Sequence, residues 1–191
     1  MKKKVEKQVV PIKLDLGCGS NKKGADWIGC DQYKMPGVDK VFPLGSGKWP
    51  FKDNSVDEVN CSHVIEHLTN FNEKWERVHF FNELYRVLKA GAKCALVFPH
   101  WCSNRFYGDP THKEPFSEMG FYYLSREWRK GQAPHSDIAW NKNGYNCDFE
   151  ATWGYSLHPQ IMSRNTEYQQ NALAFYKEAA QDIVATLVKK V

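Results

Sequence analysis

The order of apolar and polar positions along the chain predicts strands that alternate with helices. Apolar-rich stretches at residues 9–16, 27–31, 38–44, 55–61 and 94–98 are short and end at glycine, proline or polar residues, as strands do. Between the last two stretches, apolar residues at helical spacing predict a helix that Gly91 ends: Val78, Phe81, Leu84, Tyr85 and Leu88. This alternation favours a mostly parallel sheet covered by helices.

The rest of the chain divides into a polar start, an aromatic middle and a periodic end. Residues 1–8 are rich in charge and are expected to form a flexible lead-in. Residues 100–147 are predicted to be loop-like, and residues 148–157 to form a strand pair. Residues 167–190 are predicted to be helical, because apolar positions recur at alternating spacings of three and four: Leu173, Tyr176, Ala180, Ile183 and Leu187.

Composition adds few constraints. The 191 residues carry a net charge of +4, which is too weak to indicate a nucleic-acid partner. No apolar run of about 18 residues is present, so no membrane-spanning helix is expected. The six cysteines include no C-x-x-C pair, and the N-terminus lacks the apolar core of a secretion signal. Free thiols in a cytoplasmic protein are therefore expected.

A glycine turn follows the first predicted strand in the segment LDLGCGS, residues 14–20. Glycines there let backbone N–H groups approach a ligand, but Lys22 occupies the third glycine position of a dinucleotide fingerprint. Asp31 ends the second strand, where a carboxylate can accept hydrogen bonds from both hydroxyls of a ribose. Only 12 residues separate Gly19 from Asp31, so the first helix is expected to be stunted.

Four segments together resemble one enzyme family. Residues 14–20, 50–59 (PFKDNSVDEV), 62–67 (SHVIEH) and 83–92 (ELYRVLKAGA) are similar, in the same order, to four motifs of the type 11 group of class I S-adenosylmethionine-dependent methyltransferases. The match departs from the family at Ala90 and Ala92, which replace a proline and a glycine. It also departs at Pro43-Leu44, where an acidic residue often follows the third strand.

The resemblance implies a Rossmann-like three-layer sandwich, formed by residues 1–191 as a single domain, and S-adenosylmethionine as cofactor. It implies backbone contacts from the glycine turn to the methionine portion, the ribose on Asp31, and a loop that Asp15 orients. Ser62 and His63 are expected near the sulfonium. The expected cofactor-binding residues are Asp15, Gly17, Cys18, Gly19, Asp31, Leu44, Ser62 and His63.

Methyl transfer to a hydroxyl also needs a base that removes the proton. Histidine suits this task because its pKa is near neutrality. His63, His100 and His112 are the candidates, from their positions beside the predicted cleft and, for His112, from its acidic neighbours. Each of them is equally compatible with a structural role in the core or at the surface.

The pentapeptide HVIEH, residues 63–67, also matches the H-x-x-E-H pattern of a class of zinc peptidases. Such a site needs both histidines on one helix face and a further carboxylate ligand. Because the methyltransferase motifs account for the pentapeptide without a metal, no metal site is predicted. A zinc hydrolase is retained as a remote alternative.

The acceptor is expected to be a small molecule or a saccharide, methylated on a hydroxyl or a similar nucleophile. Residues 109–112 with Phe116 resemble a loop in predicted methyltransferases associated with glycan modification, and residues 100–147 carry aromatics suited to a lid or to a core. The D/N-P-P-Y motif of base-amine methylation and the Pro-Cys pair of cytosine methylation are both absent, so nucleic acid is not the expected substrate. A non-catalytic cofactor-binding protein of the same fold is the main alternative, and the oligomeric state is left open.

Overall fold

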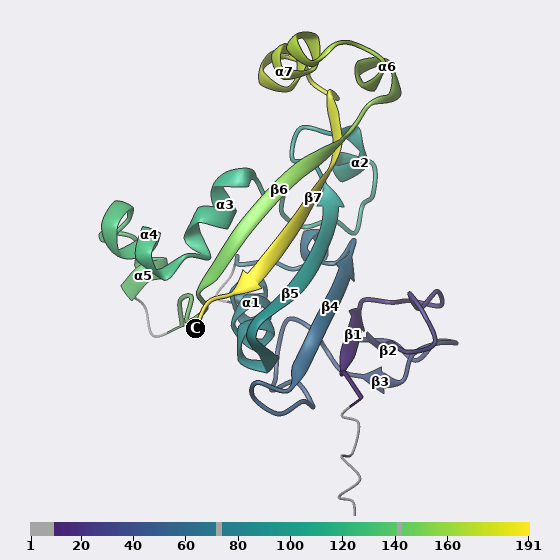
Figure 1. The fold of residues 1–191 in the computed structure, drawn as a ribbon, viewed down its shortest axis with the longest axis vertical. Helices are drawn as coiled ribbons and strands as arrows, with labels where there is room; N and C mark the ends of the chain where they lie inside the picture. The colour runs from purple at the N-terminus through teal and green to yellow at the C-terminus, as the bar shows by residue number, and fades with distance from the viewer. Residues whose placement is uncertain (1–9, 72–73, 141–142) are drawn as a thin grey trace, which may run out of the picture.

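A seven-stranded sheet forms the centre of the molecule, in the order β3-β2-β1-β4-β5-β7-β6 (Figure 1). The computed structural model describes residues 10–71, 74–140 and 143–191. Neighbouring strands from β3 to β5 are parallel, whereas β7 runs antiparallel to both β5 and β6. The strands are β1 (Lys13–Leu16), β2 (Ile28–Asp31), β3 (Lys40–Val41), β4 (Val56–Ser62), β5 (Leu88–Pro99), β6 (Phe149–Leu157) and β7 (Ala180–Lys189).

The predicted fold class is confirmed, since a mostly parallel sheet carries flanking helices. The five predicted strand regions coincide with β1 to β5, although β3 contains only two residues. The expected lead-in at residues 1–8 lies outside the described residues. The segment between β1 and β2 contains turns and no helix, so the crossover is shorter than a helical one, as the 12-residue spacing predicted.

Helix α1 (Glu76–Val87) buries the apolar face that the spacing predicted, with Val78, Phe81 and Leu84 at most 1% exposed. The prediction that Gly91 ends this helix is wrong. The chain leaves the helix at Leu88, which is extended and pairs with Val56 of β4. Gly91 instead lies within an irregular part of β5, where its φ of 74° suits a residue without a side chain.

The prediction of one helix over residues 167–190 is wrong in its second half. Helix α7 (Thr166–Phe175) covers the first part, and strand β7 covers the second. Ile183 and Leu187 are four residues apart, an even separation that places both on one face of a strand as well as on one face of a helix. Ala185 between them is also buried whereas Val184 is exposed, so the true period is two.

The predicted strand pair at residues 148–157 is also wrong, because this segment is the single strand β6, which pairs with β7. The two strands extend beyond the rest of the sheet, and α6 (Pro159–Met162) and α7 lie at their far end (Figure 1). No helix in the described ranges has the length and apolar character needed to cross a membrane.

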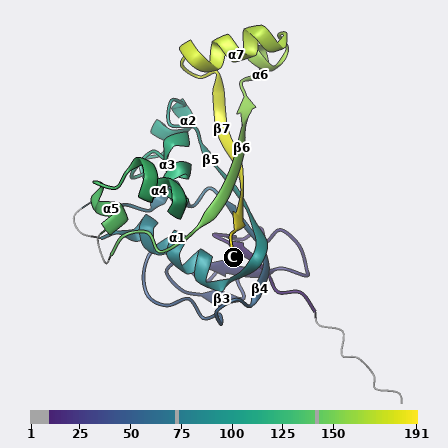
Figure 2. The same ribbon diagram turned by 60° about the vertical axis from the view of Figure 1, so that its left-hand side comes forward.

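Residues 100–147 are more ordered than the loop-like segment that was predicted. They contain the short helices α2 (Asn104–Tyr107), α3 (Glu118–Tyr123), α4 (Arg126–Gln132) and α5 (Asp137–Trp140). Helices α3, α4 and α5 gather on the same side of the strands as α1 (Figure 2). Phe106, Phe116 and Phe121 are buried there, whereas Trp101 and Tyr107 are exposed, so the aromatics divide between the core and the surface.

The six cysteines are all free, and five of them are buried, which confirms the expectation of thiols without disulfides. Burial raises the pKa of Cys30 and of Cys94 to about 12. These thiols therefore stay protonated near neutrality and serve as small apolar core residues.

Candidate functional site

The ends of β1 and β2 lie next to each other and are joined through Asp31. One oxygen of its carboxylate accepts a hydrogen bond from the backbone N–H of Gly19 at 3.0 Å, and the other accepts one from Tyr33 at 3.0 Å. The carbonyl of Cys30 accepts hydrogen bonds from the N–H groups of Gly17 (2.8 Å) and Cys18 (3.2 Å). The glycine turn is therefore bound directly to the end of the neighbouring strand.

Glycine is required at position 17 for two reasons. Its φ is 69°, in the left-handed region, and a Cβ built there would lie 2.2 Å from Cγ2 of Val64. A side chain would meet both backbone strain and a steric clash with a buried residue. The close packing on Val64 leaves the backbone of Gly17 at the wall of the adjoining cavity.

Asp15 lies beneath this turn and is 4% exposed. One of its carboxylate oxygens accepts a hydrogen bond from the N–H of Lys23 at 2.7 Å, and the other accepts one from the Asn60 side chain at 2.6 Å. Asp15 thus ties the segment after β1 to β4. It orients the loop and is not among the residues that line the cavity.

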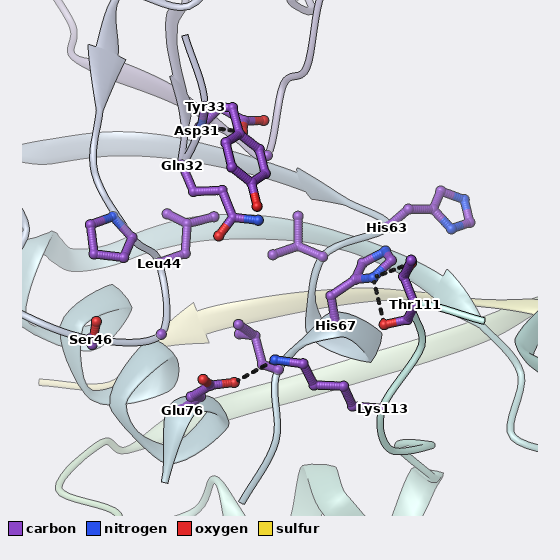
Figure 3. A pocket seen from close by; sticks show the side chains of 15 residues that line it. Asp31, Gln32, Tyr33, Leu44, Ser46, His63, His67, Glu76, Thr111 and Lys113 are labelled. Atoms are coloured by element: carbon purple, nitrogen blue, oxygen red, sulfur yellow. Dashed lines mark hydrogen bonds and ion pairs between the residues drawn. The ribbon is translucent and has the colours of Figure 1, made fainter. Parts of the chain in front are cut away.

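A cavity of about 530 Å³ opens at the carboxyl ends of the strands (Figure 3). This volume lies within the usual range for small-molecule sites, and the location is the one at which open α/β sheets bind ligands. One end is formed by residues after β2 and β3, including Asp31, Tyr33 and Leu44. The other end is formed by His67, Thr111 and Lys113, and the Lys113 ammonium pairs with Glu76 at 3.1 Å.

Of the eight cofactor-binding residues predicted from the sequence, Gly17, Asp31, Leu44 and His63 line this cavity. Cys18 and Gly19 lie in the same turn, and Asp15 and Ser62 lie at the ends of adjacent strands, without forming the wall. The other lining residues were not among the predicted cofactor-binding residues. They are Gln32, Tyr33, Pro43, Gly45, Ser46, Val64, His67, Leu68, Glu76, Thr111 and Lys113.

The segment that follows β4 forms only the single 3₁₀ turn η1 (Ile65–His67). His63 precedes this turn with a φ of 56°, so it does not share a helix face with His67. Its Nδ1 lies 3.1 Å from Oε1 of Glu66, and in Figure 3 its ring points away from Asp31 and Leu44. The hydrogen bond to Glu66 raises the pKa of His63, against the lowering effect of its burial.

His112 lies in the loop between α2 and α3, and its ring packs edge-on against that of His67, with 4.7 Å between the centroids. Its Nδ1 bonds the carbonyl of Phe106 at 2.7 Å. His112 itself does not line the cavity, but its neighbours Thr111 and Lys113 do. The loop is held against η1 by a hydrogen bond of 2.8 Å from the N–H of Lys113 to the carbonyl of Glu66.

His100 is buried away from the cavity wall. Its Nε2 lies 3.1 Å from Oε1 of Glu118, which also accepts a hydrogen bond from the Tyr155 hydroxyl at 3.0 Å. Partial burial acts to raise the pKa of Glu118. Hydrogen bonds with His100, with the backbone of Glu118 and with Tyr155 outweigh this effect, so the pKa of Glu118 is lowered to about 2. This arrangement indicates a structural role for His100, whose hydrogen bond to Glu118 joins the end of β5 to α3.

Replacing Glu118 with glutamine is expected to destabilise the protein by about 1–2 kcal/mol near pH 7. A carboxylate with a lowered folded-state pKa stabilises the fold above its ordinary pKa of 4.5 and loses that effect as the pH falls toward about 2. The difference between wild type and Glu118→Gln, measured by urea unfolding at several pH values, should therefore shrink between pH 5 and pH 2. The exposed Glu127→Gln is the control, and a difference that does not change with pH would contradict this assignment.

This chain is similar to methyltransferases both in sequence, through a family model, and in fold, through solved structures. The family model for the methyltransferase domain matches residues 42–96. An S-adenosylmethionine-dependent methyltransferase from Archaeoglobus fulgidus superposes with a TM-score of 0.57 at 19% identity, covering 94% of this chain and 86% of the other. A methyltransferase from Methanosarcina mazei gives 0.52 at 17% identity, covering 94% and 92%.

Geranyl diphosphate C-methyltransferase from Streptomyces coelicolor gives a TM-score of 0.51 at 15% identity, covering 95% of this chain and 71% of the other. The fold is that of the class I methyltransferases. The resemblance to the type 11 group is confirmed by the domain match over residues 42–96. No significant match is found among curated protein sequences.

Four of the additional lining residues illustrate two kinds of position within the fold. Gln32 and Tyr33 directly follow Asp31 at the end of β2. Their place next to a candidate ligand-binding carboxylate was a signal that could have predicted them. Thr111 and Lys113 reach the cavity from a loop 44 or more residues beyond His67 along the chain. No local sequence pattern predicts that this loop folds back to line the cavity.

Proposed function

We propose that the chain is an S-adenosylmethionine-dependent methyltransferase that acts on a hydroxyl or similar nucleophile of a small molecule or saccharide. The observation that carries the proposal is the pair of adjacent strand ends, with Gly17 and Asp31 on one cavity. The cavity is open to an acceptor at its other end. The domain match and the shared fold support the same activity.

In this proposal the cofactor would lie along the strand ends, where the following groups would bind it. Each oxygen of the Asp31 carboxylate accepts one backbone N–H, from Gly19 or from Tyr33, and keeps a further lone pair. These lone pairs would accept hydrogen bonds from the ribose hydroxyls. Leu44 offers an apolar surface to the adenine ring, and the backbone at Gly17 lies beside the methionine portion. His67 and Thr111 line the remaining end of the cavity, where an acceptor would bind.

In the transfer, the acceptor oxygen attacks the methyl carbon, the C–S bond breaks with its electron pair passing to sulfur, and the hydroxyl proton leaves to a base. The sulfonium already activates the methyl group, so the protein mainly has to align the acceptor and exclude water. Of the three histidines considered, His63 lines the cavity, whereas His100 and His112 do not. We assign proton acceptance to His63 on that geometry.

The acceptor end carries groups that suit a hydroxylated ligand. Thr111 offers a hydroxyl, and Lys113 offers an ammonium that also pairs with Glu76. Polar groups of this kind bind sugar-like or acidic small molecules through hydrogen bonds. The cavity is a pocket between loops, which fits a small acceptor better than a duplex nucleic acid.

Binding of S-adenosylhomocysteine, followed by calorimetry, tests the cofactor assignment. One molecule is expected to bind per chain with a Kd of about 1–100 μM, which corresponds to roughly 5.5–8 kcal/mol. A screen of hydroxylated small molecules and saccharides that follows S-adenosylhomocysteine release tests the transfer. Absence of binding would contradict the proposal, and binding without release for any acceptor would favour a cofactor-binding protein without catalysis.

A further inference from the structure

Three side chains beside the acceptor end of the cavity form a cluster with the composition of a metal site. Glu66 and His67 come from η1, and His112 comes from the loop that packs against it. One ligand atom from each lies within 4.8 Å of the other two. Two histidines and one carboxylate are a ligand set that binds divalent transition metals.

Both histidines are oriented as metal-bound histidines usually are. The Nδ1–H of His112 donates to the carbonyl of Phe106 at 2.7 Å. Nδ1 of His67 lies 3.3 Å from the carbonyl of Thr111 and 3.2 Å from its hydroxyl, whose own proton is donated to Asp109. These partners are acceptors, so each imidazole carries its proton on Nδ1 and leaves the lone pair of Nε2 free. An outer hydrogen bond of this kind fixes the tautomer of a metal ligand.

The carboxylate of Glu66 lacks the partners that its burial requires. Glu66 is 1% exposed, and its Oε2 is a buried oxygen that has no hydrogen-bond partner among the residues that the structure describes. Its Oε1 lies 3.1 Å from His63 and 4.0 Å from Nε2 of His112. A buried carboxylate oxygen without a donor is unfavourable, and a bound cation would satisfy it.

We propose that Glu66, His67 and His112 bind one divalent transition-metal cation at the acceptor end of the cavity. Tetrahedral ligands about 2.0–2.1 Å from a zinc ion lie about 3.4 Å apart, so the three groups reach this geometry by closing in by at most about 1.4 Å. Mixed nitrogen and oxygen ligands favour ions such as Zn²⁺, Mn²⁺, Fe²⁺ or Co²⁺ over Ca²⁺ and Mg²⁺, which prefer oxygen alone.

The site differs from the peptidase arrangement considered from the sequence. The H-x-x-E-H pattern would make His63 a metal ligand, but His63 does not belong to the cluster. His112 is the second histidine of the cluster instead. Three protein ligands leave at least one coordination position open, as in catalytic rather than structural sites. His67 lines the cavity, so the cluster borders the space in which an acceptor would bind.

The consequence for the acceptor rests on the proposed methyltransferase function. A cation at this position would bind an acceptor oxygen and favour its deprotonated form, because metal coordination lowers the pKa of a bound hydroxyl or water. The preferred acceptor class is therefore an oxygen nucleophile, and a compound with adjacent hydroxyls offers two oxygens to one ion.

Titration of the full-length, metal-stripped protein with Co²⁺ tests the site. One Co²⁺ is expected to bind per chain, with visible absorption that reports nitrogen and oxygen ligands. His67→Gln and His112→Gln are each expected to weaken binding at least about 100-fold. His67 is only partly buried, so His67→Gln should keep the fold, which circular dichroism and thermal unfolding check.

The exposed His135→Gln is the matched control, and it should bind Co²⁺ like the wild type. No binding by the wild type, or equal binding by folded His67→Gln and wild-type protein, would overturn the metal site. Co²⁺ is titrated without cofactor, and S-adenosylhomocysteine is titrated without metal. If only the Co²⁺ titration fails, the metal site is refuted and the proposed function stands. If only the S-adenosylhomocysteine titration fails, the proposed function is refuted and the metal site stands.

Discussion

Replacing Asp31 with alanine should weaken the binding of S-adenosylhomocysteine at least about 100-fold, the largest effect on cofactor binding that the structure predicts. The variant loses two hydrogen bonds from ribose hydroxyls to a charged acceptor. Each bond to a charged group contributes about 1.5–3 kcal/mol, and about 2.7 kcal/mol corresponds to 100-fold in Kd. Asp31 is only 8% exposed, so water does not readily replace the missing carboxylate.

The same substitution also removes the links from Asp31 to the N–H groups of Gly19 and Tyr33, so part of the loss comes from a looser turn. Asp31→Asn separates the two contributions, because an amide retains one acceptor oxygen for the turn or the ribose. It should lie between alanine and wild type. Asp26→Asn, at an exposed aspartate that pairs with Lys13, is the control. Calorimetry in which a folded Asp31→Ala binds as tightly as the wild type would refute the ribose assignment.

The cofactor end of the cavity was largely predictable from the sequence because it is built from local segments. A strand, a glycine turn and a second strand that ends in Asp31 lie within 19 residues, and parallel pairing brings their ends together. The steric need for glycine at position 17 depends instead on Val64, from a distant part of the chain. Sequence identified the residue, but only the structure gives the reason.

The acceptor end was not predictable in the same way. Glu66 and His112 are 46 positions apart, and they meet because the loop after α2 folds back onto η1. The pentapeptide around Glu66 directed attention to the pair His63 and His67, whose spacing of four implies one helix face. The left-handed conformation of His63 prevents that helix, so the spacing alone gave the wrong partner.

The arrangement of η1 and this loop depends on one buried arginine. Arg77, on α1, is 4% exposed, and its guanidinium donates to four backbone carbonyls. Two of them belong to the η1 region, Ile65 (3.0 Å) and Leu68 (3.1 Å), and two to the loop, Glu114 (2.6 Å) and Pro115 (3.2 Å). The Glu114 carboxylate, at 3.8 Å, is the nearest countercharge.

Arg77→Leu is therefore expected to lower the free energy of unfolding by about 3–5 kcal/mol, the largest stability effect that the structure predicts. Leucine fills part of the space but removes the guanidinium donors from four carbonyls and the cation from Glu114. Of these four, the Ile65 carbonyl keeps another donor, the N–H of Leu68 at 3.2 Å. In a chain of this length, the loss corresponds to a decrease in Tm of roughly 10 °C. Urea unfolding gives the free energy, and thermal unfolding gives the Tm.

Arg164→Leu, at an exposed arginine between α6 and α7, should change the stability by less than about 0.5 kcal/mol and serves as the control. Arg77→Lys keeps the charge but cannot reach four carbonyls with one ammonium, so it should recover only part of the loss. Because Arg77 holds both η1 and the loop that carries His112, a folded Arg77→Lys should also bind Co²⁺ more weakly. An Arg77→Leu protein as stable as the wild type would show that the two segments are held together by their own packing, and that the guanidinium fills space without joining them.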